Sequence, residues 1–217
     1  MTSAPSASAP TLLVLHALRL AGTANEAQVA GRTGLGLADV STLLLDFAAY
    51  GWASKVSFSD VDAWALTARG HDRDDHLLAA ELQTVDRATL ADGHRAFEEL
   101  NPALVKACTD WQLRPRRGDR FASNDHRDRR WDRRILGELV TIGEGLVPIA
   151  VQLRSVLTRF DGYDRRFAAA LERADSGEHQ WVAGVEVPSC HAVWMELHED
   201  LLSTLAIPRS AEIGKSR

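Results

Sequence analysis

The chain has 217 residues, of which 45% are hydrophobic, and its formal net charge is −5 at pH 7. This length supports one or two domains with a buried core, and the acidic balance does not favour a polyanionic partner for the chain as a whole. No uncharged apolar run approaches the roughly 18 residues of a membrane span. No cationic segment precedes an apolar one, as it does in a signal peptide. These features predict a cytoplasmic protein that does not bind a membrane.

The ends of the chain and its cysteines carry little chemistry. Residues 1–10 contain no charged side chain and predict a flexible tail. Residues 209–217 are also expected to form a flexible tail. Cys108 and Cys190 lie far apart and outside any CxxC pattern. This spacing indicates two buried small hydrophobic residues and argues against a disulfide or a metal site.

The first structured segment predicts two short helices. One covers 11–20, with Thr11 as its N-cap after a proline. The next covers 25–32, with Asn25 as its N-cap and a glycine-rich turn after it.

A third helix and a β-hairpin follow. The helix covers 37–50 and ends at Gly51, a residue type that favours helix C-termini. Strands over 52–58 and 63–67 flank a short polar turn and predict the hairpin. The apolar residues of the helix recur at helical spacing and predict one buried stripe: Leu37, Val40, Leu44 and Phe47.

The order helix, helix, turn, helix, hairpin resembles the winged-helix domains of MarR-like bacterial regulators. The resemblance rests on residues 37–51 as the recognition helix and on Leu66-Thr67-Ala68-Arg69-Gly70, which is similar to the "L-T-x-x-G" exit from the wing in that family. It implies a winged helix-turn-helix domain over 11–70 that binds double-stranded DNA. In such domains the third helix enters the major groove, and dimers read two half-sites.

The charge of the expected recognition helix does not match that role. Residues 37–50 contain no Lys or Arg and two Asp, and residues 1–70 carry four basic groups against five acidic ones. Affinity for DNA depends largely on Lys and Arg. The positions expected to be exposed on this helix are Ala38, Asp39, Ser41, Thr42, Leu45 and Asp46. The candidate DNA contacts are Arg32, Ser41, Thr42 and Lys55.

The remainder of the chain predicts a wholly helical domain over 71–208. The fold class is therefore mainly α, with an N-terminal winged helix-turn-helix followed by an α-helical domain. Asn101-Pro102 is expected to start a new helix. The expected helices cover 70–85, about 90–100, 102–111, 129–145, 148–160, 165–175 and 188–206.

Residues 114–134 concentrate positive charge, with nine Arg and four Asp. Three interpretations remain open: a solvated loop with Asp–Arg pairs, the rim of a pocket for an anionic small molecule, and an auxiliary nucleic-acid contact. Arginine suits phosphate and carboxylate recognition. The interleaved Asp residues favour the first two interpretations.

Two groups of polar residues could form a site. Asn124, Asp125 and His126 precede a helix start, where Asn124 or Asp125 could serve as the N-cap. In the last helix, the spacing predicts one inward face that carries His191, Trp194, Met195 and His198. Glu196, Glu199 and Asp200 are expected on a different, solvated side, and the pair Glu98-Glu99 is also expected to be solvated. His191 and His198 lie roughly 10 Å apart along the helix axis, too far to share one metal ion comfortably.

Parts of the C-terminal half are similar to a helical domain found behind winged helices in actinobacterial proteins. The stretches concerned are 111–115, 124–126 and 191–202. This resemblance implies a ligand-sensing or protein-docking role. The implied site residues are Trp111, Arg114, Asn124, Asp125, His126, His191, Trp194, Glu196 and His198.

Together these observations predict a DNA-binding transcriptional regulator that acts as a homodimer and senses a small anionic effector. No catalytic motif and no metal or other cofactor is indicated. One alternative is a winged-helix protein-interaction module that does not bind DNA. Another is a small helical enzyme that acts on an anionic metabolite at a pocket around His198.

Overall fold

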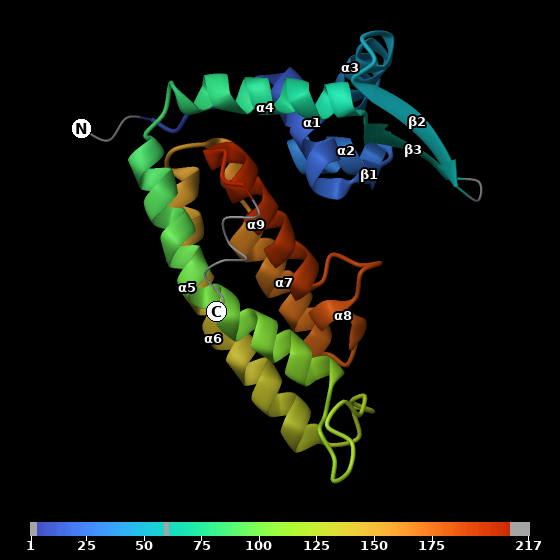
Figure 1. Ribbon diagram of the computed structural model, residues 1–217, viewed down its shortest axis with the longest axis vertical. Helices are drawn as coiled ribbons and strands as arrows, with labels where there is room; N and C mark the ends of the chain where they lie inside the picture. The colour runs from blue at the N-terminus through green and yellow to red at the C-terminus, as the bar shows by residue number, and fades with distance from the viewer. Residues whose placement is uncertain (1–3, 59–60, 209–217) are drawn as a thin grey trace. The chain divides into compact units, whose positions relative to one another are not determined.

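The computed structural model describes residues 4–58 and 61–208, and it is mainly helical with one small antiparallel sheet (Figure 1). The chain divides into two compact units. The N-terminal unit comprises Met1–Arg87, Val156–Arg159 and Glu199–Arg217, and the helical unit comprises Ala88–Ser155 and Phe160–His198. The expected tail over 209–217 and the tip of the hairpin at 59–60 lie outside the described residues.

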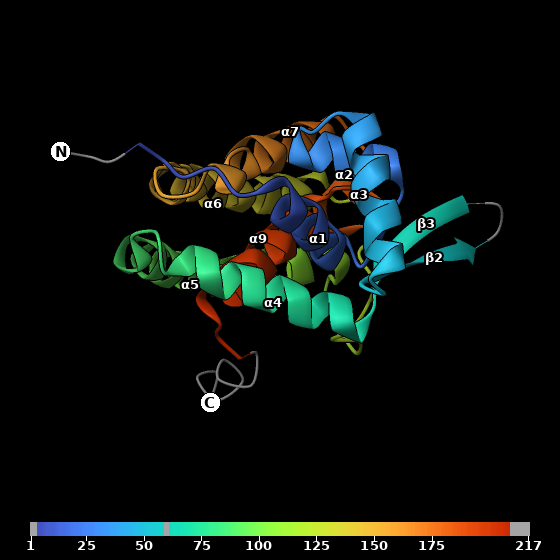
Figure 2. The ribbon, with the colours of Figure 1, turned by 90° about the horizontal axis from the view of Figure 1, so that it is seen from above.

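The N-terminal unit combines the first four helices and the end of the last helix with the sheet. Its first elements are α1 (Pro10–Ala21), β1 (Thr23–Ala24), α2 (Glu26–Thr33), α3 (Leu37–Ala49), β2 (Ala53–Phe58), β3 (Val61–Leu66) and α4 (Ala68–Leu82). The strand order is β1-β3-β2, and both pairings are antiparallel. The sequence did not indicate β1, a two-residue strand. Figure 2 shows the β2–β3 hairpin extending away from α3.

Local sequence signals explain where these helices begin and end. The side chain of Asn25 accepts a hydrogen bond from the backbone of Gln28, and the Gln28 side chain accepts one from the backbone of Asn25, so the predicted cap of α2 is confirmed. Thr11 is not a cap, because α1 begins at Pro10. Proline suits the first turn of a helix, where its missing N–H costs no hydrogen bond.

The predicted stripe of α3 is confirmed at three of its four positions. Val40, Leu44 and Phe47 are fully buried, but Leu37 is 54% exposed. Leu37 is the first residue of α3 and lies beyond the core that the other three share with α1 and β3.

The "L-T-x-x-G" segment has a physical basis in the packing of α4. The Thr67 side chain caps α4 by accepting a hydrogen bond from the backbone of Gly70. A Cβ atom at Gly70 would lie 1.9 Å from the carbonyl oxygen of Trp52. Only glycine allows this close approach between α4 and the start of the hairpin.

The helical unit consists of long helices that run beside one another (Figure 1). Its elements are α5 (Arg87–Gln112), α6 (Arg129–Arg154), α7 (Tyr163–Asp175), α8 (Gln180–Ala183) and the first part of α9 (Cys190–Leu205). A short 3₁₀ helix, η1 (Thr158–Phe160), lies at the boundary of the two units. The sequence predicted α7 and α9 to within about two residues at each end but missed α8.

Two predicted helix breaks are wrong, because α5 continues through Pro102 and α6 continues through Pro148. A proline removes one backbone donor and disfavours the helix interior, but tertiary packing can outweigh that cost. The glycines near Pro148 serve packing. A Cβ at Gly143 would lie 3.2 Å from the ring of Phe167, and one at Gly145 would lie 3.1 Å from Leu100.

Both cysteines are free and buried, as the sequence predicted. Burial raises the pKa of the Cys108 and Cys190 thiols to about 12. Thiols with such a pKa stay protonated and unreactive near neutral pH.

Helix α6 is long and apolar enough to cross a membrane by length and composition alone. It also carries Glu138 and Glu144 within its apolar stretch. Its buried residues recur along one face, and α6 packs against α7. Inside the structure 33% of this apolar stretch is buried, which is compatible with a soluble protein.

Candidate functional site

The exposed face of α3 is apolar and acidic. Leu45 is 61% exposed and Leu37 is 54% exposed, and Tyr50 at the end of the helix is 59% exposed. Asp39 and Asp46 are also exposed. The positions that the sequence predicted to be exposed are confirmed except for Ser41, which is half-buried.

The hydroxyl groups of α3 already have intramolecular partners. Ser41 donates a hydrogen bond to Glu26 of α2. Thr42 is exposed, and its hydroxyl donates to the carbonyl oxygen of Ala38 at 2.9 Å. A base or phosphate would have to compete with these contacts.

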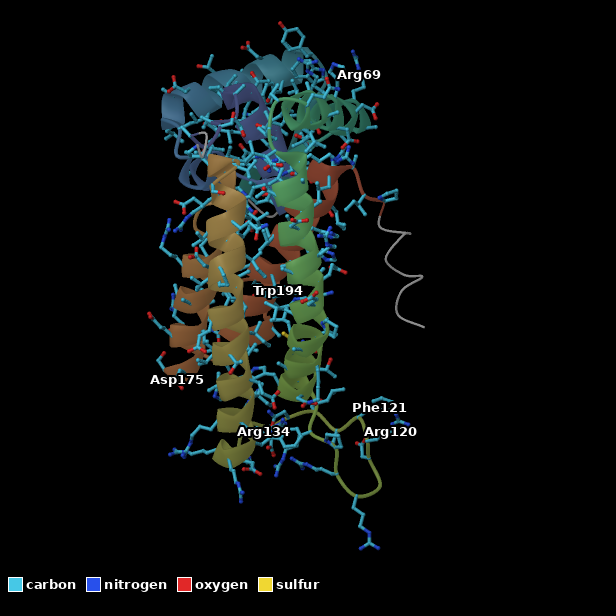
Figure 3. All side chains as sticks on the ribbon, turned by 90° about the vertical axis from the view of Figure 1, so that its left-hand side faces the viewer. Arg69, Arg120, Phe121, Arg134, Asp175 and Trp194 are labelled. Atoms are coloured by element: carbon cyan, nitrogen blue, oxygen red, sulfur yellow. The ribbon has the colours of Figure 1, made fainter. Side chains whose placement is uncertain are left out.

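Positive charge lies beside α3 rather than on it. Lys55 is exposed on β2, with its ammonium 5.3 Å from the centre of the Trp64 ring, and Arg32 is half-buried near the end of α2. Arg69 in the first turn of α4 is exposed (Figure 3). A Cβ at Gly51, two residues after the end of α3, would lie 3.5 Å from the Arg69 guanidinium. The sequence reasoning did not select Arg69, although it belongs to the "L-T-x-x-G" motif.

In the helical unit, three of the predicted site residues come together where the loop after α5 meets α6. The Asn124 amide donates to the carbonyl oxygen of Trp111 at 3.0 Å and to Asp132 at 2.9 Å. It also lies 3.2 Å from Nδ1 of His126. Asn124 therefore ties the loop to both flanking helices.

His126 lies at the centre of this cluster in a strained conformation. Its φ of 53° falls in the left-handed region, which residues other than glycine seldom adopt. Its Nδ1 lies 3.2 Å from Asp132, and its ring is 4.6 Å from that of Trp111 and 4.2 Å from that of His179. The Trp111 indole donates to the carbonyl oxygen of His179. Asp132 and His179 were missed, because only the fold brings them to the Asn124 loop.

The predicted helix cap in this loop is wrong. Asp128, rather than Asn124 or Asp125, caps α6 by accepting hydrogen bonds from the backbone of Trp131 and Arg130. Donation from Trp131 lowers the pKa of Asp128, and Arg130 adds to this effect. Asp128 succeeds because it directly precedes the helix, while Asn124 is already engaged with the loop.

The arginine-rich segment forms several local ion pairs. Arg114 pairs with Asp128, and Arg116 pairs with Asp125 at 2.9 Å. Arg134 contacts Asp110 at 3.2 Å, and Figure 3 shows it near the start of α6. These pairs support the interpretation as a solvated loop with Asp–Arg pairs. Two of the predicted ligand contacts, Arg114 and Asp125, are thus held by neighbouring charges.

The inward face of α9 is confirmed for Trp194 and wrong for Met195, which is 38% exposed. Trp194 is fully buried inside the helical unit (Figure 3). Its indole donates to the side chain of Asn101 at 3.0 Å, and its ring stacks on Phe97. His198, one turn later, lies 3.2 Å from Glu98. Glu98 is therefore not the solvated acid that the sequence suggested.

The remaining predicted residues of α9 differ in their surroundings. Burial lowers the pKa of His191, which is half-buried. Glu196 forms a two-point ion pair with Arg166. None of the three acids expected to be solvated is free of partners, since Glu199 contacts Arg19 and Asp200 is 2% exposed.

A buried charge network in the N-terminal unit is the largest feature that the sequence reasoning missed. His16 lies between two carboxylates, with Nδ1 3.1 Å from Asp74 and Nε2 3.1 Å from Asp200. Asp200 also pairs with Arg159, which contacts Glu81 at 3.2 Å. A neutral imidazole donates from only one nitrogen, so two carboxylate partners require the charged form.

The pKa of His16 follows from this arrangement. Burial opposes the charged imidazolium, but attraction and hydrogen bonding to Asp200, with a hydrogen bond to Asp74, outweigh it and raise the pKa of His16. The positive charge of Arg159 lowers the pKa of His16. The network joins α1, α4 and the end of α9. It explains why Asp200 is buried on an otherwise amphipathic helix.

A depression of about 710 Å³ lies elsewhere in the N-terminal unit, beside α4. Arg19 and Arg87 line it together with apolar side chains that include Leu82, Leu202 and Ile207. None of the ligand-binding residues that the sequence predicted lines this depression.

No protein-family model, curated protein or solved structure matches this chain.

Proposed function

We propose that residues 10–66 form a winged helix and that the protein is a DNA-binding transcriptional regulator. The observation that carries this proposal is the element order α1-β1-α2-α3-β2-β3 with the strand order β1-β3-β2. In this arrangement α3 is the recognition helix and the β2–β3 hairpin is the wing. A regulator of this class acts in the cytoplasm as a homodimer.

In this proposal the wing and the recognition helix have separate roles. Lys55 on the wing and Arg69 beside Gly51 are the exposed cations that would contact phosphates, with Arg32 as a further contact. Phosphate contacts give affinity and register, whereas base contacts give specificity. Ser41 and Thr42 are the polar side chains of α3 that would meet base edges.

The test is titration of labelled duplex DNA with the full-length protein at about 50 mM and about 200 mM salt. We expect binding that weakens with salt. Lys55→Ala should reduce the slope of log affinity against log salt concentration by about one unit, as expected for one lost phosphate contact. The matched control is Arg95→Ala, which removes an exposed cation from α5 in the helical unit and should leave the slope unchanged. Absence of binding at both salt concentrations contradicts the proposal, as does an equal effect of the two variants.

The effector half of the proposal rests on the cluster around His126. Trp111 and His179 supply aromatic faces, and nearby Arg114 and Arg116 supply guanidinium groups that a carboxylate or phosphate could recruit from Asp128 and Asp125. Strain at His126 accords with a functional position. In a thermal-shift screen, a dicarboxylate or phosphate ester should raise the melting temperature of the protein. His179→Ala should abolish this increase. If no anion raises the melting temperature, this half of the proposal fails.

The exposed side chains of α3 favour a second candidate function, a protein-interaction module. Leu45, Leu37 and Tyr50 present apolar surface where a DNA reader would carry cations. The same DNA titration separates the two functions, because this candidate predicts no DNA binding at either salt concentration. Leu45→Glu should then abolish capture of a partner protein, while Val105→Glu on exposed α5 surface should not.

A further inference from the structure

In the described part of the chain, two groups of three His, Asp or Glu side chains offer donor atoms that all lie within 4.8 Å of one another. One is the cluster of His126, Asp132 and His179 described above. The other consists of His94 and Glu98 of α5 with His198 of α9. All three residues of this second group belong to the helical unit.

We propose that His94, Glu98 and His198 bind a divalent first-row transition-metal ion such as Zn²⁺. His94 and Glu98 are four residues apart on α5 and therefore project from the same face of the helix. His198 approaches from α9, with its Nε2 3.2 Å from a carboxylate oxygen of Glu98. Two imidazoles and one carboxylate form a ligand set that suits Zn²⁺ and related ions. This proposal does not depend on DNA binding by the N-terminal unit.

The packing around the three side chains holds them in place. Trp194 precedes His198 by one turn of α9, and its indole hydrogen bond to Asn101 fixes the register of α9 on α5. Phe97, next to Glu98, stacks on Trp194 with ring centres 4.4 Å apart and contacts the His198 ring at 5.4 Å. Ligands on packed helices keep the precise geometry that a metal site needs.

Charge and burial favour a cation at this position. His94 is buried, and the side chains of His198 and Glu98 are 12% and 29% exposed. Partial burial makes a carboxylate costly unless an opposite charge lies beside it. A dication compensates the carboxylate and accepts the lone pairs of both rings.

The donor atoms must come closer together to bind zinc. Zinc ligands at the usual bond lengths lie about 3.3 Å from one another in a tetrahedral site. The donors here lie within 4.8 Å. Three protein ligands would leave the fourth position open to water or a small anion, as in sites that exchange ligands.

The cluster around His126 is a poorer metal site. One carboxylate oxygen of Asp132 already accepts a hydrogen bond from the Asn124 amide at 2.9 Å. The rings of His126 and His179 face each other at 4.2 Å and 39°. Imidazole binds a metal in the plane of its ring, so two partly stacked rings do not converge well on one ion.

The test is titration of the tag-free, metal-stripped full-length protein with Zn²⁺ by calorimetry and with Co²⁺ by visible absorption. We expect one equivalent to bind and Zn²⁺ to raise the melting temperature. Glu98→Gln should weaken Zn²⁺ binding by about tenfold or more, and His198→Asn by about 100-fold or more. Circular dichroism and the melting temperature without metal identify any variant that has lost its fold.

Two control variants make the outcome decisive. His191→Asn changes a half-buried histidine on the same helix and should bind Zn²⁺ as the parent protein does. His179→Ala removes a donor atom of the His126 cluster and should bind Zn²⁺ as the parent protein does. The proposal is overturned if the parent protein binds no more tightly than His198→Asn. It is also overturned if His179→Ala abolishes binding while Glu98→Gln does not.

Discussion

The two units bury polar groups in different ways. In the N-terminal unit, polar side chains that include His16, Asp74 and Asp200 lie fully inside and contact one another. In the helical unit, rings such as Phe97 and Trp194 occupy the interior, and ion pairs such as Arg165–Asp161 lie at the surface. Helix α9 contributes to both, with an aromatic face before residue 199 and a buried carboxylate after it. One helix therefore contributes to an aromatic core in the helical unit and to a polar core in the N-terminal unit.

The contrast predicts different costs for removing a carboxylate. A buried ion pair gains little over apolar packing, but removal of one partner leaves the other charge uncompensated. A surface pair contributes far less, because water screens it. The following experiments test this difference, starting with the largest expected effect.

Asp200→Asn should lower the free energy of unfolding by about 3–5 kcal/mol, because His16 and Arg159 lose their shared buried counter-charge. Denaturant unfolding measures the change. The matched control is Asp161→Asn at the surface of the helical unit, where we expect a change of less than about 1 kcal/mol. Similar losses in the two variants would remove the distinction between the units.

The helical unit should respond instead to changes in packing volume. Gly93→Ala places a methyl group 2.7 Å from the side chain of Leu153, which is fully buried, and should destabilise the protein by about 1–3 kcal/mol. Gly137→Ala on α6 meets no atom within 4 Å and should stabilise it by about 0.5–1 kcal/mol, since alanine favours helix over glycine. Thermal and denaturant unfolding should show a lower stability for Gly93→Ala and a higher stability for Gly137→Ala. Equal signs would mean that α5 and α6 are less closely packed than described.

The charged His16 should make stability depend on pH. The pKa of His16 is raised in the folded state. Its contribution to the free energy of unfolding is therefore complete below the unfolded pKa of about 6.5, and it is lost as the pH rises through the folded pKa. Within that window the loss is at most about 1.4 kcal/mol per pH unit. Unfolding measured between about pH 6 and about pH 8.5 should show the decline, and His16→Gln should flatten it. An unchanged slope in His16→Gln would show that other groups cause any decline.

Much of the local structure could be predicted from the sequence. The Asn25 cap and the buried residues Val40, Leu44 and Phe47 follow from side-chain chemistry and helical period. The "L-T-x-x-G" motif is also recognisable in the sequence, although the reason for its glycine is the close approach of the Trp52 carbonyl group. The class of the fold, mainly α with a small antiparallel sheet, was predicted correctly as well.

The candidate sites were only partly predictable. Trp111, Asn124 and His126 were selected together, but their partners Asp132 and His179 come from other segments. His198 was selected for its helical face, whereas Glu98 was taken for a solvated acid and its role depends on the packing of α9 on α5. Arg114 and Asp125 were selected as ligand contacts and are paired locally instead.

The sequence by itself determined some features that depend on neighbours within about one helical turn: the Asn25 cap, the buried positions 40, 44 and 47 of α3, and the hairpin. Only the tertiary structure decided that α5 and α6 continue through Pro102 and Pro148, since packing against other helices outweighs the local cost of proline. It also decided the partners of His16 and His198. These contacts join residues as far as 184 positions apart, and no local periodicity reports which charged side chain will meet another across the fold.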